Sequence, residues 1–204
     1  DMGLISGGTA IGGRDFIADV IRAVGDLIVD GVPMRSGRPL IMGVAQGKPI
    51  FGLPGYPVSA AVAAELFVKP FVERFLGVHL PERPRVTATL ARKVASRPGN
   101  EEIVRVFVGR VGERLTAVPL ARGAGVITSL ARASGLLSIP ARSEGFDQGA
   151  RVEVQLLLPP EEVDRAVVCI GSHDLLIDVV ADRMRALDPL SSIVSGHVGS
   201  LGGL

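Results

Sequence analysis

The chain has 204 residues, of which 47% are apolar, enough for one large domain or two small ones with buried cores. Its formal net charge of +1 provides no general attraction to nucleic acid or to a membrane surface, so we expect neither as a partner. The single cysteine, Cys169, excludes an intrachain disulfide framework and is typical of a reducing compartment. The sequence shows no signal peptide and no apolar run close to the roughly 20 residues that a membrane span needs. Together these features predict a cytoplasmic protein.

Both ends of the sequence suggest a longer polypeptide. The chain opens on apolar residues that are typical of the last part of a buried strand, and it closes on a glycine-rich run over 195–204. We therefore expect this chain to be a fragment.

The first informative stretch is a glycine-rich loop over 6–15, between a short strand and a helix predicted over 16–24. The loop lacks the Gly-Lys-Ser/Thr ending of nucleotide-hydrolase phosphate loops. Asp15 stands at the start of the helix, where a carboxylate either caps the helix or helps to hold a metal ion near a phosphate. Both interpretations of Asp15 remain open. The helix is predicted from apolar residues at helical spacing, namely Phe16, Ile17, Val20, Ile21 and Val24.

A second loop follows the strand predicted over 27–29. It carries Arg35 and Arg38 on either side of a Ser-Gly turn. Two guanidinium groups on one turn can clamp a phosphate or a molybdate-like oxyanion. The alternative is a pair of solvated surface arginines.

The third loop contains two prolines and two glycines within Gly52–Pro57, after a predicted hairpin of residues 40–42 with residues 50–51. Such a backbone is neither strand nor helix. Ser59 is predicted to cap the helix expected over 61–71, so that backbone N–H groups converge on a phosphate or another oxyanion. The alternative is a purely structural turn.

From Val86 onward the pattern changes to alternating apolar residues, which predicts a small all-β module. We expect Ser129–Leu137 to form a short helix that leads into a strand at 136–139. Pro159-Pro160 is interpreted as a linker. After it, a strand at 166–170, a turn at 171–174 and a helix at 175–187 are expected, with a second anion site at the helix start. The other strands of the β module are predicted at 86–90, 103–108 and 115–120, and residues 146–157 are predicted to form a turn and the closing strand.

Three motifs in this order resemble the molybdopterin molybdotransferase family, to which part of gephyrin is also related. They are Ser6-Gly7-Gly8 with Asp15, Met34 to Pro39, and Gly52 to Ala60. The resemblance implies insertion of molybdate into adenylylated molybdopterin with release of AMP, assisted by Mg²⁺. It also implies a homodimer in the complete protein.

The resemblance also implies an α/β fold in three parts. Residues 1–80 would be the C-terminal half of a three-layer molybdopterin-binding α/β domain, and residues 84–158 the β-barrel-like C-terminal domain. Residues 164–204 resemble the start of a periplasmic-binding-protein-like α/β domain, which would be truncated here.

By position in the motifs, the resemblance implies catalytic roles for Asp15, Arg35 and Arg38, with Asp15 also facing the metal. The family often has lysine at one or both arginine positions, and Tyr56 replaces its more usual asparagine. Substrate-binding residues would be Ser6, Gly7, Gly8, Thr9, Pro54, Gly55, Tyr56, Pro57, Ser59, Arg105 and Ser129.

Two other functions stay open. One is a non-catalytic module that binds or senses a pterin phosphate or an oxyanion such as molybdate or tungstate. The other is a scaffold of the gephyrin kind, for which the sequence shows no receptor-binding signature. The chain alone, without the family's earlier carboxylate-bearing segment, is expected to be inactive.

Overall fold

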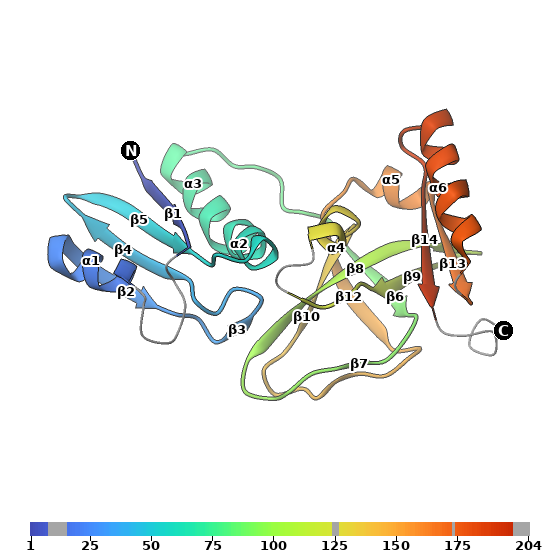
Figure 1. The fold of residues 1–204 in the computed structure, drawn as a ribbon, viewed down its shortest axis with the longest axis horizontal. Helices are drawn as coiled ribbons and strands as arrows, with labels where there is room; N and C mark the ends of the chain where they lie inside the picture. Colours follow the sequence, from blue (N-terminus) through green and yellow to red (C-terminus); the bar gives the residue numbers. More distant parts are fainter. Residues whose placement is uncertain (8–15, 124–126, 173, 198–204) are drawn as a thin grey trace. The chain divides into compact units, whose positions relative to one another are not determined.

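The chain folds into two compact units in a computed structural model that describes residues 1–7, 16–123, 127–172 and 174–197. The first unit comprises residues 1–81, 99–103 and 123–127. The second comprises residues 82–98, 104–122 and 128–204. Figure 1 shows the elements of each unit along the chain.

The first unit is built on a four-stranded sheet in the order β1-β5-β4-β2, with β1 at Gly3–Ser6, β5 at Lys48–Leu53, β4 at Ile41–Ala45 and β2 at Gly25–Asp30. Strands β1 and β5 are parallel, whereas β4 is antiparallel to both of its neighbours. The hairpin expected across residues 40–51 is confirmed as β4 and β5.

Helix α1 (Phe16–Val24) packs on one face of this sheet. Its buried residues Ile17, Ala18 and Ile21 form a cluster with Ile41 of β4. The helix lies close to the strand at Gly43, where a Cβ would be 2.6 Å from Cγ2 of Ile21. The remaining apolar residues of α1 are exposed, so only part of the predicted apolar stripe is packed; these residues are Phe16, Val20 and Val24.

A second helical run packs against the sheet at Phe51 of β5. The ring of Phe51 contacts the ring of Phe71 edge to face, with the ring centroids 5.1 Å apart. This run consists of α2 (Pro57–Ala63), a π-helical turn η1 (Ala64–Val68) and α3 (Lys69–Leu76). Ile50 belongs to the α1 cluster, and successive strand residues point to opposite faces. Phe51 and the second helical run therefore lie on the sheet face opposite α1.

The second unit contains a barrel-like sheet of five strands. The order β10-β12-β6-β9-β8 is closed by a further pairing of β8 with β10. The β-barrel-like sheet that the family resemblance implied is therefore confirmed. Its core consists mainly of valine, leucine and isoleucine on the inward faces. The five strands are β6 (Arg85–Leu90), β8 (Glu101–Val111), β9 (Arg114–Pro119), β10 (Gly135–Ile139) and β12 (Arg151–Leu156). Residues 101–103 of β8 belong to the first unit and the rest of the strand belongs to the second.

Short elements complete this module. Strands β7 (Val94–Ala95) and β11 (Gly145–Phe146) pair with each other. Helix α4 spans Ile127–Ala131, so the helix expected over 129–137 ends earlier, and Gly135 already belongs to β10.

The C-terminal residues form a strand-helix-strand unit beside β8. Strand β13 (Ala166–Gly171) and strand β14 (Ser192–His197) are parallel and are joined by α6 (Leu175–Leu187). The prediction of a linker at Pro159-Pro160 is wrong, because helix α5 (Pro160–Asp164) starts there. Proline is favoured in the first helical turn, and carboxylates there suit the helix dipole.

Candidate functional site

Strands β1, β2 and β5 end at one edge of the four-stranded sheet of the first unit. Strand β1 ends at Ser6, which is paired with Leu53 at the end of the parallel strand β5. Strand β2 ends at Asp30, which is paired with Ile41 at the start of β4, and Ile41 is in turn paired with Gly52. The segments that follow β1, β2 and β5 therefore leave the sheet on the same side. Ligands of α/β sheets bind at such carboxyl edges.

Backbone contacts hold the first and third loops together. The N–H of Gly7 donates a hydrogen bond to the carbonyl of Leu53 at 3.2 Å. A Cβ at Gly55 would lie only 3.4 Å from the Cα of Gly7, so the two glycines let the backbones approach closely. Ser6, Gly55 and Tyr56 are exposed at this edge.

The second loop is a closed turn that presents Arg35 and Arg38 to solvent. Its base is fixed by hydrogen bonds from Gly31 N–H to the Leu40 carbonyl and from Val32 N–H to the Arg38 carbonyl, each 2.9 Å long. Among the described residues Arg38 makes no ion pair. Arg35 lies 4.0 Å from the carboxylate of Glu102.

Two residues between the arginines adopt positive φ angles. Ser36 has φ 66° and Gly37 has φ 139°. The value at Ser36 is unusual for a residue with a Cβ, and backbone strain of this kind is concentrated at functional sites. The φ angle of Gly37 is one that almost only glycine adopts, and a Cβ at this position would also overlap Cε of the buried Met34.

We expect Gly37→Ala to lower the free energy of unfolding by about 1–3 kcal/mol because of backbone strain and overpacking. Thermal unfolding of the 204-residue chain measures the change. Ser36→Gly is the matched control, since it relieves positive-φ strain while adding freedom to the unfolded chain, and we expect it to be within about 0.5 kcal/mol of the parent. Equal stability of both variants would show that the turn is not constrained as described.

The third loop enters helix α2 differently from the prediction. Tyr56, not Ser59, occupies the N-cap position, and no side chain caps the helix. The reason is Pro57, whose fixed φ suits the first helical position. Ser59 is consequently inside the first turn and buried, as is Pro54 of the same loop. At this loop, Gly55, Tyr56 and Pro57 are the predicted residues that are exposed.

Arg105 and Ser129 belong to the second unit and contact each other there. Nε of the buried Arg105 donates to Oγ of Ser129 at 3.0 Å, and Nη2 donates to the carbonyl of Ala121 at 2.9 Å. Burial lowers the pKa of Arg105, because the charged form is desolvated. These hydrogen bonds fix the orientation of the Arg105 guanidinium, and a role of the two residues in binding an oxyanion stays a prediction.

Three predicted site residues lie outside the described residues, namely Gly8, Thr9 and Asp15. Within the described residues, no cluster of three or more histidine, cysteine, aspartate or glutamate side chains could hold a metal ion. The described side chains therefore do not by themselves form a Mg²⁺ site.

The predicted anion site at the start of α6 is disfavoured. Asp174 is the N-cap of this helix and its carboxylate accepts a hydrogen bond from Leu176 N–H at 2.8 Å. A carboxylate at that position competes with any anion for the free N–H groups.

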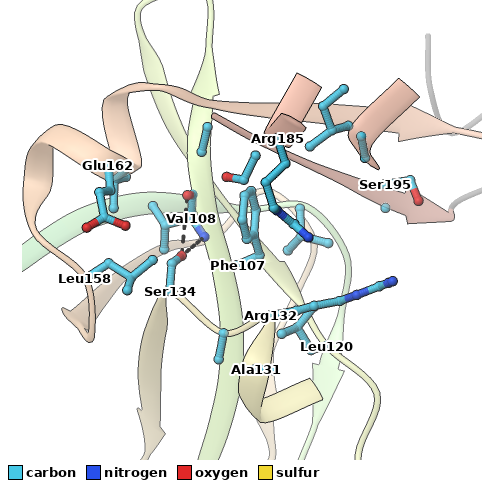
Figure 2. Close-up of a pocket in the computed structure, with 18 of the residues that line it drawn as sticks. Phe107, Val108, Leu120, Ala131, Arg132, Ser134, Leu158, Glu162, Arg185 and Ser195 are labelled. Atoms are coloured by element: carbon cyan, nitrogen blue, oxygen red, sulfur yellow. Dashed lines mark hydrogen bonds between the residues drawn. The ribbon is translucent and has the colours of Figure 1, made fainter. Parts of the chain in front are cut away.

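The second unit also contains a cavity of about 930 Å³, which the sequence did not reveal (Figure 2). It lies among β8, α5, α6 and β14, and the hydroxyl of Ser134 in its wall accepts a hydrogen bond from Val108 N–H at 2.6 Å. Three arginines and three carboxylates line it, so their charges balance and favour neither an anionic nor a cationic ligand. These residues are Arg92, Arg132, Arg185, Glu162, Asp178 and Asp182.

None of the helices in the described ranges has the length and apolar character needed to cross a membrane.

Comparisons with known proteins give two family matches. Residues 1–74 match the model of a probable molybdopterin binding domain, and residues 87–157 match the MoeA C-terminal region, domain IV. Neither match extends over residues 164–204, so the expected periplasmic-binding-protein-like segment has no support there.

Individual relatives agree with these matches. A putative molybdopterin biosynthesis protein of Methanocaldococcus jannaschii is 41% identical over 154 residues, which cover 76% of this chain and 36% of that protein. A molybdopterin molybdenumtransferase of Bacillus subtilis is 29% identical over 159 residues, covering 77% of this chain and 37% of that protein.

A solved structure of a molybdopterin biosynthesis MoeA protein from Pyrococcus horikoshii superposes with a TM-score of 0.62 at 37% identity. The superposition covers 78% of this chain and 37% of that protein. The chain thus spans little more than a third of the length of these relatives. It is similar to MoeA proteins of molybdenum cofactor biosynthesis over two consecutive domains.

Proposed function

We propose that this chain is part of a molybdopterin molybdotransferase, which inserts molybdate into adenylylated molybdopterin. In this reaction molybdate attacks the adenylylated cofactor, AMP leaves, and molybdenum is delivered to the dithiolene. The observation that carries the proposal is the common sheet edge reached by the loops after β1, β2 and β5. Both family matches and the relatives named above are consistent with it.

The exposed arginines would bind the anionic parts of the substrates. Arg35 and Arg38 carry fixed positive charge and several N–H donors each, which suits phosphate and molybdate oxygens. The N–H groups near Gly55 and at the start of α2, which no side chain caps, are further donors. Preorganised donors of this kind stabilise charge that develops as the AMP phosphate leaves.

Asp15 would complete the site as the carboxylate near the phosphate. Mg²⁺ would assist the reaction by balancing the negative charge of the phosphate. Arg105 and Ser129 would contribute donors to the molybdate pocket.

The proposal extends to the complete protein. It includes a three-layer molybdopterin-binding domain, a homodimer, a cytoplasmic location, and a periplasmic-binding-protein-like domain that begins near residue 164. The parallel strand-helix-strand unit of β13, α6 and β14 is compatible with an α/β domain of that kind.

A host strain that lacks its own molybdotransferase provides the test. The complete protein is expected to restore the molybdenum cofactor and to prevent accumulation of adenylylated molybdopterin. Asp15→Asn is expected to abolish this restoration if the charge acts on metal or phosphate, because asparagine caps a helix about as well as aspartate does. Full restoration by Asp15→Asn would assign only a capping role to Asp15.

The alternative function is a binding or sensing module for a pterin phosphate or an oxyanion without turnover. The observation that favours it is the exposed pair of Arg35 and Arg38, because two such guanidinium groups can bind an oxyanion without any turnover. A complete protein that binds adenylylated molybdopterin but releases no AMP would support this alternative.

A further inference from the structure

The turn that carries Arg35 is attached to the first residues of β8. Strand β3 (Met34–Arg35) runs parallel to β8, with Met34 paired with Glu101 and Arg35 paired with Glu102. The N–H of Glu101 also donates to the carbonyl of Pro33 at 3.0 Å. All these residues belong to the first unit.

The two neighbouring glutamates of β8 have different surroundings. Glu101 is exposed, whereas Glu102 has only 7% of its surface exposed. Glu101 is the first residue of the strand and lies at its exposed end, whereas burial begins at Glu102 and continues to Gly109. The buried carboxylate is the one that faces Arg35.

The contact between Arg35 and Glu102 is an ion pair without a hydrogen bond. Nη1 of Arg35 lies 4.0 Å from Oε2 of Glu102, which is beyond hydrogen-bond distance. In the part of the chain that the structure describes, the Arg35 guanidinium donates no hydrogen bond, and its side chain is 43% exposed. The carboxylate of Glu102 therefore attracts the Arg35 guanidinium, while the N–H donors of that guanidinium stay available for a ligand.

We propose that Glu102 is a positioning residue that holds Arg35 ready for the anionic substrate, an inference that rests on the proposed function. A long arginine side chain loses rotamer freedom when it binds a ligand, and a fixed charge nearby reduces that loss in advance. Arg38 has no such ion pair among the described residues, so the two arginines of the turn have different roles. Arg35 is preorganised, and Arg38 is free to adapt to the ligand.

A double-mutant cycle in the complete protein tests this proposal. Glu102→Gln removes the charge and keeps the size of the side chain. We expect it to raise KM for adenylylated molybdopterin roughly 3- to 10-fold, the cost of ordering one rotamer-rich side chain, with little change in kcat. In an Arg35→Ala background the same replacement should have no further effect on KM, because the group it positions is gone.

Glu101→Gln is the matched control. It removes the same charge from the adjacent residue of the same strand, and we expect an unchanged KM. Glu102→Asp keeps the charge on a shorter side chain and should give an intermediate KM. Thermal unfolding of each variant identifies any loss of folded enzyme, and Glu102→Asp preserves the test if Glu102→Gln fails to fold.

The outcomes separate this inference from the proposed function. If Arg35→Ala is impaired while Glu102→Gln has a normal or lowered KM, the positioning role is wrong and the proposed function stands. Equal effects of Glu102→Gln with and without Arg35 would also overturn the positioning role. If Arg35→Ala retains full activity, both the role of Arg35 in the proposed function and this inference fail.

Discussion

Phe51→Ala is expected to lower the free energy of unfolding of the 204-residue chain by about 3–5 kcal/mol, the usual cost of emptying a buried aromatic site. Phe51 is 1% exposed and is the β5 side chain that packs against α3 through Phe71. Its loss removes the edge-to-face ring pair and leaves a cavity between the sheet and the helical run.

The control for this prediction is Phe75→Ala. Phe75 stacks on Phe71 with ring centroids 6.0 Å apart, but it is 56% exposed. We expect a loss of less than about 1.5 kcal/mol, since little apolar area returns to water. Chemical denaturation of both variants measures the difference. Similar losses for the two variants would mean that Phe51 is not the main contact between the sheet and α3.

The effect of Phe51→Ala should reach the candidate site. Phe51 lies two residues before Leu53, whose carbonyl accepts the hydrogen bond from Gly7. A loosened β5 would therefore disturb the contact between the first and third loops. The packing of Phe51 in the core therefore helps to hold the first and third loops in place, so the geometry of the candidate site depends on the sheet as well as on the loops.

Local sequence signals predicted most of this edge. The turn with two glycines over 43–48 and the short apolar runs at 40–42 and 50–51 predicted β4 and β5, and helix α1 has the predicted bounds of 16–24. Short-range patterns of this kind are set by the backbone preferences of a few residues. The bounds of α6 were predicted for the same reason.

Where local signals competed, the prediction was wrong. Ser59 is a good N-cap by residue type, but Pro57 had already fixed the start of the helix. Similarly, the Pro159-Pro160 pair suggested a linker, although the second proline is the first residue of α5. In both cases a proline is the first residue of the helix. The sequence pattern predicted a later start for α2 and no helix at the position of α5.

Long-range pairing could not be predicted from the sequence. The short strand β3 is formed only because residues far along the chain, at the start of β8, pair with it. For the same reason Glu102 was not singled out, since nothing near it in the sequence indicates that it faces Arg35. The parallel pairing of β14 with β13 was also missed, because the stretch after residue 195 was interpreted as a glycine-rich run.

The double replacement of Arg35 and Arg38 by alanine is expected to have the largest effect on activity. A charge-assisted hydrogen bond contributes about 1.5–3 kcal/mol, so each single replacement should lower kcat/KM of the complete protein roughly 10- to 150-fold. If the two guanidinium groups bind separate anionic groups of the substrates, the double variant should lose about the product of the two factors, on the order of 10²–10⁴.

Two controls separate binding from folding. Replacing both arginines by lysine keeps the charge and loses the fork geometry, so we expect a partial loss of kcat/KM. Arg74→Ala removes a positive charge from the last turn of α3, at the other end of the helical run that begins at Pro57, and should leave kcat/KM unchanged. Arg35→Ala also removes the ion-pair partner of Glu102, so thermal unfolding must accompany the kinetics. If the alanine double variant keeps the parent kcat/KM, the two arginines are solvated surface residues, and the sheet edge is not the substrate site.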